Sequence, residues 1–121
     1  MAITQTTTTV LGATLFQDTA NGNTAVSVKA SSATVYLLEL DNTANSAATY
    51  VKLYNLASGS VVVGTTAPDA IILVPSTTKI DVAVPSGWIF GTALSVASLT
   101  TGGTAGVTSP ASAMIVRVLY A

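Results

Sequence analysis

The chain has 121 residues, with four basic and five acidic side chains, a formal net charge of −1, and neither His nor Cys. General bases, nucleophiles and metal ligands come mainly from His, Cys, Asp, Glu and Lys, so little material remains for a catalytic site. Four positive charges make no basic patch, which argues against nucleic acid as a partner, and the lack of Cys excludes disulfide bonds.

The length suits a single domain, and a half-hydrophobic, weakly charged composition is the opposite of a disordered one. The longest apolar runs, such as Ala70–Val74, are far too short to cross a bilayer as helices, so we expect no membrane partner. Near-neutral net charge favours association. The composition therefore indicates a folded domain that forms a homo-oligomer.

Residues 1–10 are set apart as an N-terminal arm or edge strand, before a single domain over residues 11–121. The stretch from Ile3 to Val10 is rich in Thr and uncharged, so it has β propensity but little apolar area. It could add to a sheet edge, and a frayed terminus is an equal alternative.

Alternation of apolar and polar residues predicts strands in the first half of the chain. A strand at residues 26–29 follows a turn signal at Asn21–Asn23, and residues 50–56 form another. In the strand at residues 34–40, one face carries Tyr36, Leu38 and Leu40, and the other carries Val35, Leu37 and Glu39. Residues 41–46 between them are rich in side chains that bond their own backbone, which predicts a loop.

The second half gives further strands. Residues 71–74 form a short apolar run closed by Pro75, and residues 78–84 place Ile80, Val82 and Val84 inward. Residues 85–87 read as a turn, residues 88–96 as a strand, and residues 99–112 as a long loop or irregular hairpin. In the closing strand, residues 114–120, Ile115, Arg117 and Leu119 oppose Met114, Val116, Val118 and Tyr120.

About eight strands with turns between them and no helical periodicity predict an all-β fold, either a sandwich or a closed barrel. We favour a single antiparallel β-sandwich. Jelly-roll connectivity is one strand order that fits, although the order does not follow from the pattern.

Each of the four cations stands alone within a separate predicted strand: Lys29, Lys52, Lys79 and Arg117. A lone charge on the solvent face of a strand blocks unwanted edge pairing, and this interpretation is favoured. The alternative is that they contact an acidic partner.

Two groups of acidic and amide residues are candidate sites. Glu39 and Asp41 are two apart on a strand, as a glycosidase carboxylate pair could be, but any two acids so placed meet that distance, and a strand end entering a solvated turn is favoured. Asp41, Asn42 and Asn45 offer oxygens to a hard cation, but their spacing lacks the Gly and Glu of a calcium loop, which favours a turn held by side-chain hydrogen bonds.

The remaining candidates are equally weak. A Ser or Thr nucleophile would need a base, and without His only a Lys could serve. Gly102–Gly106 lacks the lysine of a phosphate-binding loop, so a flexible tip is favoured. A glycan-stacking platform could use aromatic residues, although Trp88 more naturally fills a core corner; these residues are Trp88, Tyr36, Tyr50, Tyr54 and Tyr120. We expect no catalytic residue, cofactor or metal.

The stretch Leu40–Asn55, LDNTANSAATYVKLYN, resembles small structural proteins of tailed bacteriophage virions. Later parts also resemble that family, over residues 33–121 in all: Thr66–Pro68, Ile71–Pro75, Pro85–Gly91 and Val107–Tyr120. The chain departs from the pattern in carrying Gly-Thr before Thr66. The resemblance implies a virion component and marks fold rather than any binding residue.

From composition, strand pattern and resemblance, we expect a non-enzymatic virion protein that decorates or cements a capsid. Its expected partners are itself, as a homotrimer or another symmetric cluster, and the major capsid protein. A tail, neck or fibre component is the alternative, and a glycan-binding module is a third.

Overall fold

The structure, a computed structural model, describes residues 3–7 and 13–121. Two antiparallel sheets pack face to face as a β-sandwich, which confirms the predicted fold class. The nine strands described are β1 (Ile3–Thr7), β2 (Thr14–Asn21), β3 (Val26–Lys29), β4 (Ala33–Asp41), β5 (Thr49–Tyr54), β6 (Ala70–Val74), β7 (Lys79–Phe90), β8 (Leu94–Leu99) and β9 (Met114–Tyr120). A 3₁₀ turn, η1 (Ser58–Ser60), lies between β5 and β6.

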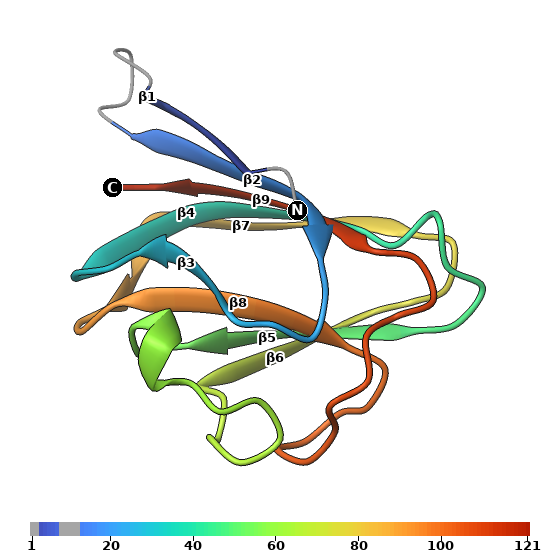
Figure 1. Cartoon of the computed structure of the whole chain (residues 1–121). Helices are drawn as coiled ribbons and strands as arrows, with labels where there is room; N and C mark the ends of the chain where they lie inside the picture. The colour runs from blue at the N-terminus through green and yellow to red at the C-terminus, as the bar shows by residue number, and fades with distance from the viewer. Residues whose placement is uncertain (1–2, 8–12) are drawn as a thin grey trace.

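The connectivity is that of a jelly roll. One sheet has the order β1-β2-β9-β4-β7 and the other the order β3-β8-β5-β6. From β2 onward every connection crosses between the sheets except the one from β5 to β6, which are neighbours in one sheet. Figure 1 shows the five-stranded sheet above and the four-stranded sheet below, with long loops gathered beneath the latter.

Every second side chain along a strand points inward, and these side chains from both sheets fill the space between them. β9 shows the alternation most clearly, because Met114, Val116, Val118 and Tyr120 are buried while the residues between them are half-buried, as predicted. In β7, Ile80 and Val82 pack against the core and Lys79 and Asp81 point to solvent. The inner faces thus follow the pattern of the sequence.

The strand boundaries differ from the prediction at three places. β2 was not predicted, because Leu15 and Phe16 stand side by side and the polar Asp18 and Asn21 are buried, which breaks the alternation. Residues 85–87 are not a turn but continue β7, with Gly87 at φ +87°. The predicted strand at residues 88–96 is therefore divided between the end of β7 and the start of β8.

The faces of β4 also differ from the prediction. Its register against both β7 and β9 shifts between Val35 and Leu37, which marks a β-bulge. The extra residue puts Val35 in the core with Leu38 and Leu40, and leaves Tyr36 half-buried. Simple alternation therefore assigned Val35 and Tyr36 to the wrong faces.

The N-terminal segment forms an edge strand over the part that is described. β1 pairs with β2 at the border of the five-stranded sheet. The Gln5 side-chain amide donates hydrogen bonds to the Val28 carbonyl and the Tyr120 hydroxyl, which ties β1 to both sheets. Residues 1–2 and 8–10 of the predicted arm lie outside the described residues.

Candidate functional site

The carboxylates of Glu39 and Asp41 lie on one strand, but each is held by its own partners. Glu39 forms an ion pair with Arg117, and its other oxygen lies 3.7 Å from Lys79 Nζ. Asp41 Oδ1 accepts hydrogen bonds from the Thr43 hydroxyl (2.6 Å) and backbone N–H (2.9 Å). These bonds, aided by nearby cations, lower the pKa of Asp41 below its ordinary value against the smaller effect of burial. The pair is thus organised as a strand end entering a turn.

Asn42 and Asn45 are buried, and their side chains form a hydrogen-bond network that connects several loops. Asn42 Nδ2 donates to three backbone carbonyls, those of Ala47, Val74 and Pro75. Asn42 Oδ1 accepts from Asn45 Nδ2 at 2.8 Å and from the Thr49 hydroxyl at 2.9 Å. Their amide oxygens are therefore occupied by the protein itself. Within residues 3–7 and 13–121, no group of three or more His, Cys, Asp or Glu side chains could hold a metal ion.

Asn45 extends this hydrogen-bond network to a third loop. Its Nδ2 donates to the Ser112 carbonyl at 2.8 Å, and its Oδ1 accepts from the Ser112 N–H at 2.7 Å. The turn predicted at residues 41–46 is present, but its side chains bond distant segments as well as their own. The local sequence carries no signal for those distant partners.

The glycine-rich segment around Gly102–Gly106 lies against the outer face of the four-stranded sheet. A Cβ on Gly102 would lie 2.9 Å from the ring of Tyr50, so only glycine lets the loop approach so closely. The Ala105 carbonyl accepts a long hydrogen bond, 3.5 Å, from Lys52 Nζ. The segment thus covers side chains of β5 where a free tip was predicted.

Lys52 is fully buried beneath this loop, which corrects its assignment as a lone charge on a solvent face. Burial lowers its pKa, because an ammonium loses hydration there. Tyr54, two residues further along the same face, is also fully buried, and its hydroxyl finds no hydrogen-bond partner among the described residues. Burial raises the pKa of that phenol. Lys79 and Arg117, by contrast, remain partly exposed and pair with Glu39.

The aromatic residues do not gather into one exposed platform. Trp88 is half-buried and packs on Phe90, with ring centroids 4.9 Å apart, and against the core. Tyr54 and Tyr120 are buried, while Tyr36 and Tyr50 are half-buried on different sheets. Trp88 thus fills a core corner, as the sequence favoured.

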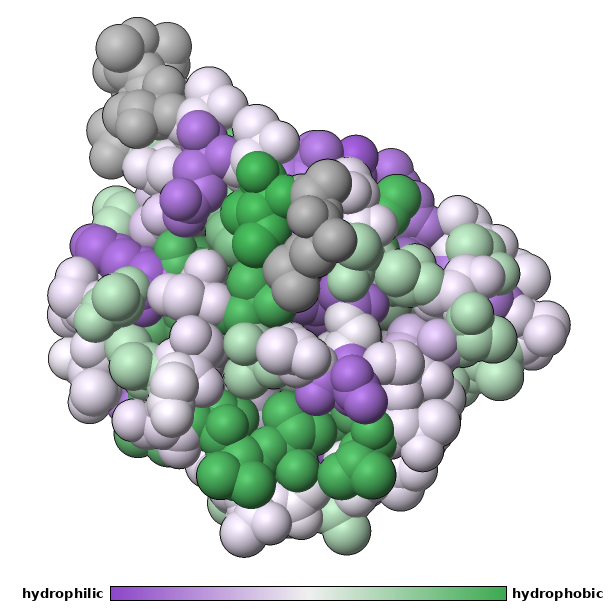
Figure 2. All heavy atoms as spheres, in the orientation of Figure 1, coloured by the Kyte–Doolittle hydropathy of each residue, from purple (hydrophilic) through white to green (hydrophobic). Residues whose placement is uncertain are grey.

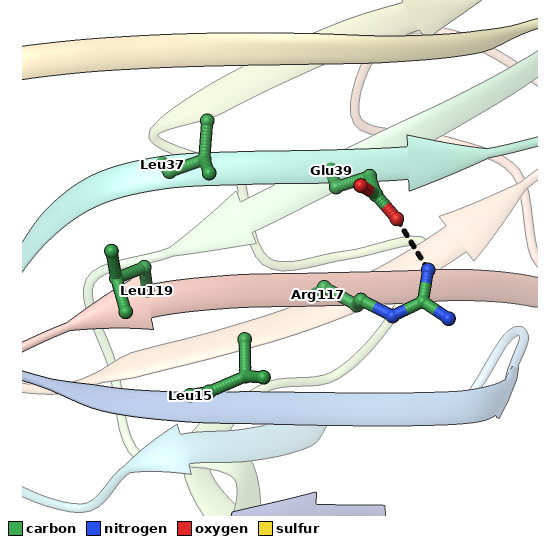
Figure 3. A pocket seen from close by; sticks show the side chains of 5 residues that line it. All are labelled: Leu15, Leu37, Glu39, Arg117 and Leu119. Atoms are coloured by element: carbon green, nitrogen blue, oxygen red, sulfur yellow. Dashed lines mark hydrogen bonds and ion pairs between the residues drawn. The ribbon is translucent and has the colours of Figure 1, made fainter. Parts of the chain in front are cut away.

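A shallow hollow of about 230 Å³ lies on the outer face of the five-stranded sheet. Three half-buried leucines, Leu15 on β2, Leu119 on β9 and Leu37 on β4, line it in one cross-strand row. Glu39 and Arg117 form its polar wall, and Figure 3 shows their ion pair beside the leucines. Arg117 Nε also donates to Gln17 Oε1 at 2.8 Å, which fixes the guanidinium along the sheet.

The sequence pointed to two of the three strands at this hollow. Leu37 with Glu39, and Arg117 with Leu119, were each placed on one face of a predicted strand. Leu15 was missed because β2 was not predicted. Charged side chains with their charges paired, beside a row of leucines, form a surface suited to contact with another apolar surface.

Comparison with known proteins found no family model, no curated protein and no solved structure that matches this chain. In the part of the chain that the structure describes, no helix has the length and hydropathy that a membrane crossing requires.

Proposed function

We propose that this chain is a non-enzymatic structural protein of a tailed-bacteriophage virion, which decorates the capsid and stabilises it by burying surface against the shell. The observation that carries the proposal is the leucine hollow on the five-stranded sheet, the three-strand row of Leu15, Leu37 and Leu119 beside the Glu39–Arg117 pair. The sequence resemblance to virion proteins supports the same proposed role. Jelly-roll domains also occur in both viral capsids and lectins, so the fold alone does not choose between them.

The hollow supports a protein partner better than a small ligand. It is lined by aliphatic side chains, and its two charged groups already neutralise each other. An apolar side chain of the major capsid protein would bury the leucines at roughly 25 cal/mol per Å² of apolar area, before the cost of association. Because few free charges take part, binding should depend little on salt.

Cryo-electron microscopy of the phage particle that encodes this chain tests the proposal. Density for the jelly roll on the outer capsid surface, with the leucine hollow against the shell, is the expected result. Density confined to the tail, neck or fibre would favour that alternative role, and a particle without this chain would overturn a virion role.

A binding assay maps the contact. Capsids that lack the protein are mixed with purified chain and sedimented, and the bound fraction is measured. Leu119→Ser should reduce binding at least about tenfold, whereas Ile89→Ser, at a residue 71% exposed outside the hollow, should leave it unchanged. Equal binding by both variants, with unchanged thermal melts, would remove the hollow from the contact.

The glycan-binding alternative rests on Trp88 and the tyrosines. Packing of Trp88 against Phe90 and the core leaves only part of its ring for stacking on a sugar. A titration of Trp88 fluorescence with a broad sugar panel should therefore stay flat, and a saturable change would favour this alternative.

A further inference from the structure

The free edge of β6 lacks the features that normally prevent strands from pairing with other chains. β6 borders the four-stranded sheet, and its five residues, AIILV, carry no charge and no proline. Its pairing with β5 runs through all five residues without a register shift. Natural sheets usually protect an edge with charges, proline, a bulge or a covering segment.

Two of the other three sheet borders in the described part of the chain, β7 and β3, do carry such features. β7 has Lys79, Asp81 and Pro85, and its pairing with β4 contains a bulge. β3 has only four residues, ends in Lys29 and also contains a register shift against β8. β1 also has no charge and no proline, but three of its five residues are Thr, so its edge is more polar than that of β6.

The outer face of β6 adds exposed apolar side chains to this open edge. Ile71 is 39% and Leu73 50% exposed, and they stand opposite Lys52 and Tyr50 on β5. The loops that bury Lys52 thus leave the next strand uncovered. Two more exposed apolar residues lie on loops of the chain, Val62 between β5 and β6 and Val107 between β8 and β9. Figure 2 shows hydrophobic residues gathered at the lower border of the molecule.

We propose that β6 is a self-association edge, at which the β6 strand of a second copy adds in antiparallel orientation about a two-fold axis midway between Ile72 and its counterpart in that copy. The two four-stranded sheets would then form one continuous sheet across the dimer. This inference does not rest on the proposed virion function.

The pleat of the strand fixes the register of this pairing. Residues directly opposite in an antiparallel pair point to the same face of the sheet. Pairing all five residues therefore sets Ile71 against Leu73 of the second copy, and the reverse, on the outer face. A shift by two residues also keeps the faces matched but pairs only three residues, so the centred register is favoured.

Charge explains why a second copy fits this edge. In the centred register, Asp69 would stand opposite Pro75 of the other copy, so the strand brings no like charges together. The net charge of each chain is only −1, so repulsion between copies is small. A self-complementary contact of this kind closes at two subunits. Because one short strand buries little area, the dimer should be weak and form at high protein concentration.

Analytical ultracentrifugation of the full chain, from micromolar to millimolar concentration, tests the proposal. A monomer–dimer equilibrium is expected for the natural sequence. Leu73→Lys should weaken the dimer at least about tenfold, since a lysine on the edge blocks pairing. Ile89→Lys replaces another exposed aliphatic side chain with the same charge on the other sheet and should leave the dimer constant unchanged.

Paired charges test the register itself. The double variant Ile71→Lys, Leu73→Lys places like charges opposite each other across the two-fold axis and should be monomeric. The double variant Ile71→Lys, Leu73→Glu places opposite charges across it and should dimerise better than the first. Ile71 and Leu73 are partly exposed, so both variants should fold, and circular dichroism checks this.

Hydrogen exchange of the unmodified chain gives a measurement that needs no variant. Backbone amides of β6 should gain protection as concentration rises, while those of β7 should not. A strict monomer at millimolar concentration, a trimer, a dimer insensitive to Leu73→Lys, or equal behaviour of the two double variants would each overturn the proposal.

Discussion

Replacing Lys52 by methionine should stabilise the fold. The side chain is fully buried, and its ammonium makes only a 3.5 Å contact with the Ala105 carbonyl, at the long limit of a hydrogen bond. No carboxylate pairs with it among the described residues. Methionine keeps an unbranched apolar chain beneath the loop and removes the polar group.

The expected gain follows from the cost of burying an unsatisfied polar group, about 1–3 kcal/mol in mutational data. For a domain of this length, each kcal/mol corresponds to a shift in Tm of about 4 °C. The matched control, Lys79→Met, removes a half-exposed lysine that lies 3.7 Å from Glu39, and should change stability by less than about 1 kcal/mol.

The gain in stability from Lys52→Met should also depend on pH in a defined direction. Because burial lowers the folded-state pKa of Lys52, the unfolded chain binds more protons at pH values between that pKa and the ordinary value of 10.5. The free energy of unfolding of the natural chain therefore contains a contribution that rises with pH across this window. Lys52→Met lacks it, so the advantage of the variant should shrink as pH approaches 10.5.

Urea denaturation of the natural chain, Lys52→Met and Lys79→Met at several pH values measures these differences. The reasoning is refuted if Lys52→Met is less stable than the natural chain at neutral pH. It is also refuted if the difference between them does not change with pH.

Three further substitutions probe the polar groups of the site region. Tyr54→Phe removes a buried hydroxyl without a partner among the described residues and should be neutral or stabilising by up to about 1 kcal/mol. Above pH 10 the unfolded chain releases the Tyr54 proton before the folded one, so the natural chain loses stability there, and Tyr54→Phe should lose less. Thermal melts at alkaline pH measure this difference. Asn42→Ala breaks five hydrogen bonds in the interior and should cost at least about 3 kcal/mol in urea denaturation, with Ser46→Ala, at an exposed position in the same turn, as a neutral control. Thr43→Ala removes the hydroxyl that does most to lower the pKa of Asp41, so that pKa should rise towards its ordinary value of 3.8 in an NMR titration. Asp41 stabilises the folded chain above its unfolded pKa, and this stabilisation is lost as pH falls through its folded pKa. In Thr43→Ala this contribution should be smaller.

The inner faces of the strands could be predicted because they depend on local alternation. β9 and the first half of β7 alternate without interruption, and the structure places their apolar residues as predicted. The bulge after Val35 could not be predicted, since it depends on the register of β4 against two strands distant in sequence. Pro85 and Gly87 signal a turn locally, yet pairing with β4 carries β7 through them.

The surroundings of the outer faces were harder to predict for the same reason. The alternation of β5 places Lys52 and Tyr54 away from the core, which is correct, but solvent exposure does not follow from it. A loop more than forty residues further on covers Lys52, and Tyr54 is fully buried as well. The leucine hollow likewise needs β2, whose buried Asp18 is satisfied by the Asn21 side chain and the Ala20 N–H. These partners lie within three residues of Asp18, but its burial comes from tertiary structure, and a polar residue at a core position hides the strand.

The hydrogen-bond network of Asn42 and Asn45 also has a consequence for the order of folding. It joins the turn after β4 to Val74 and Pro75 and, through Asn45, to Ser112, segments separated by about thirty to seventy residues along the chain. Closing such long loops is slow, so these bonds can form only after both sheets have come together. Interactions made after the folding transition state control the rate of unfolding rather than that of folding. The buried asparagines should therefore act mainly on the lifetime of the folded state.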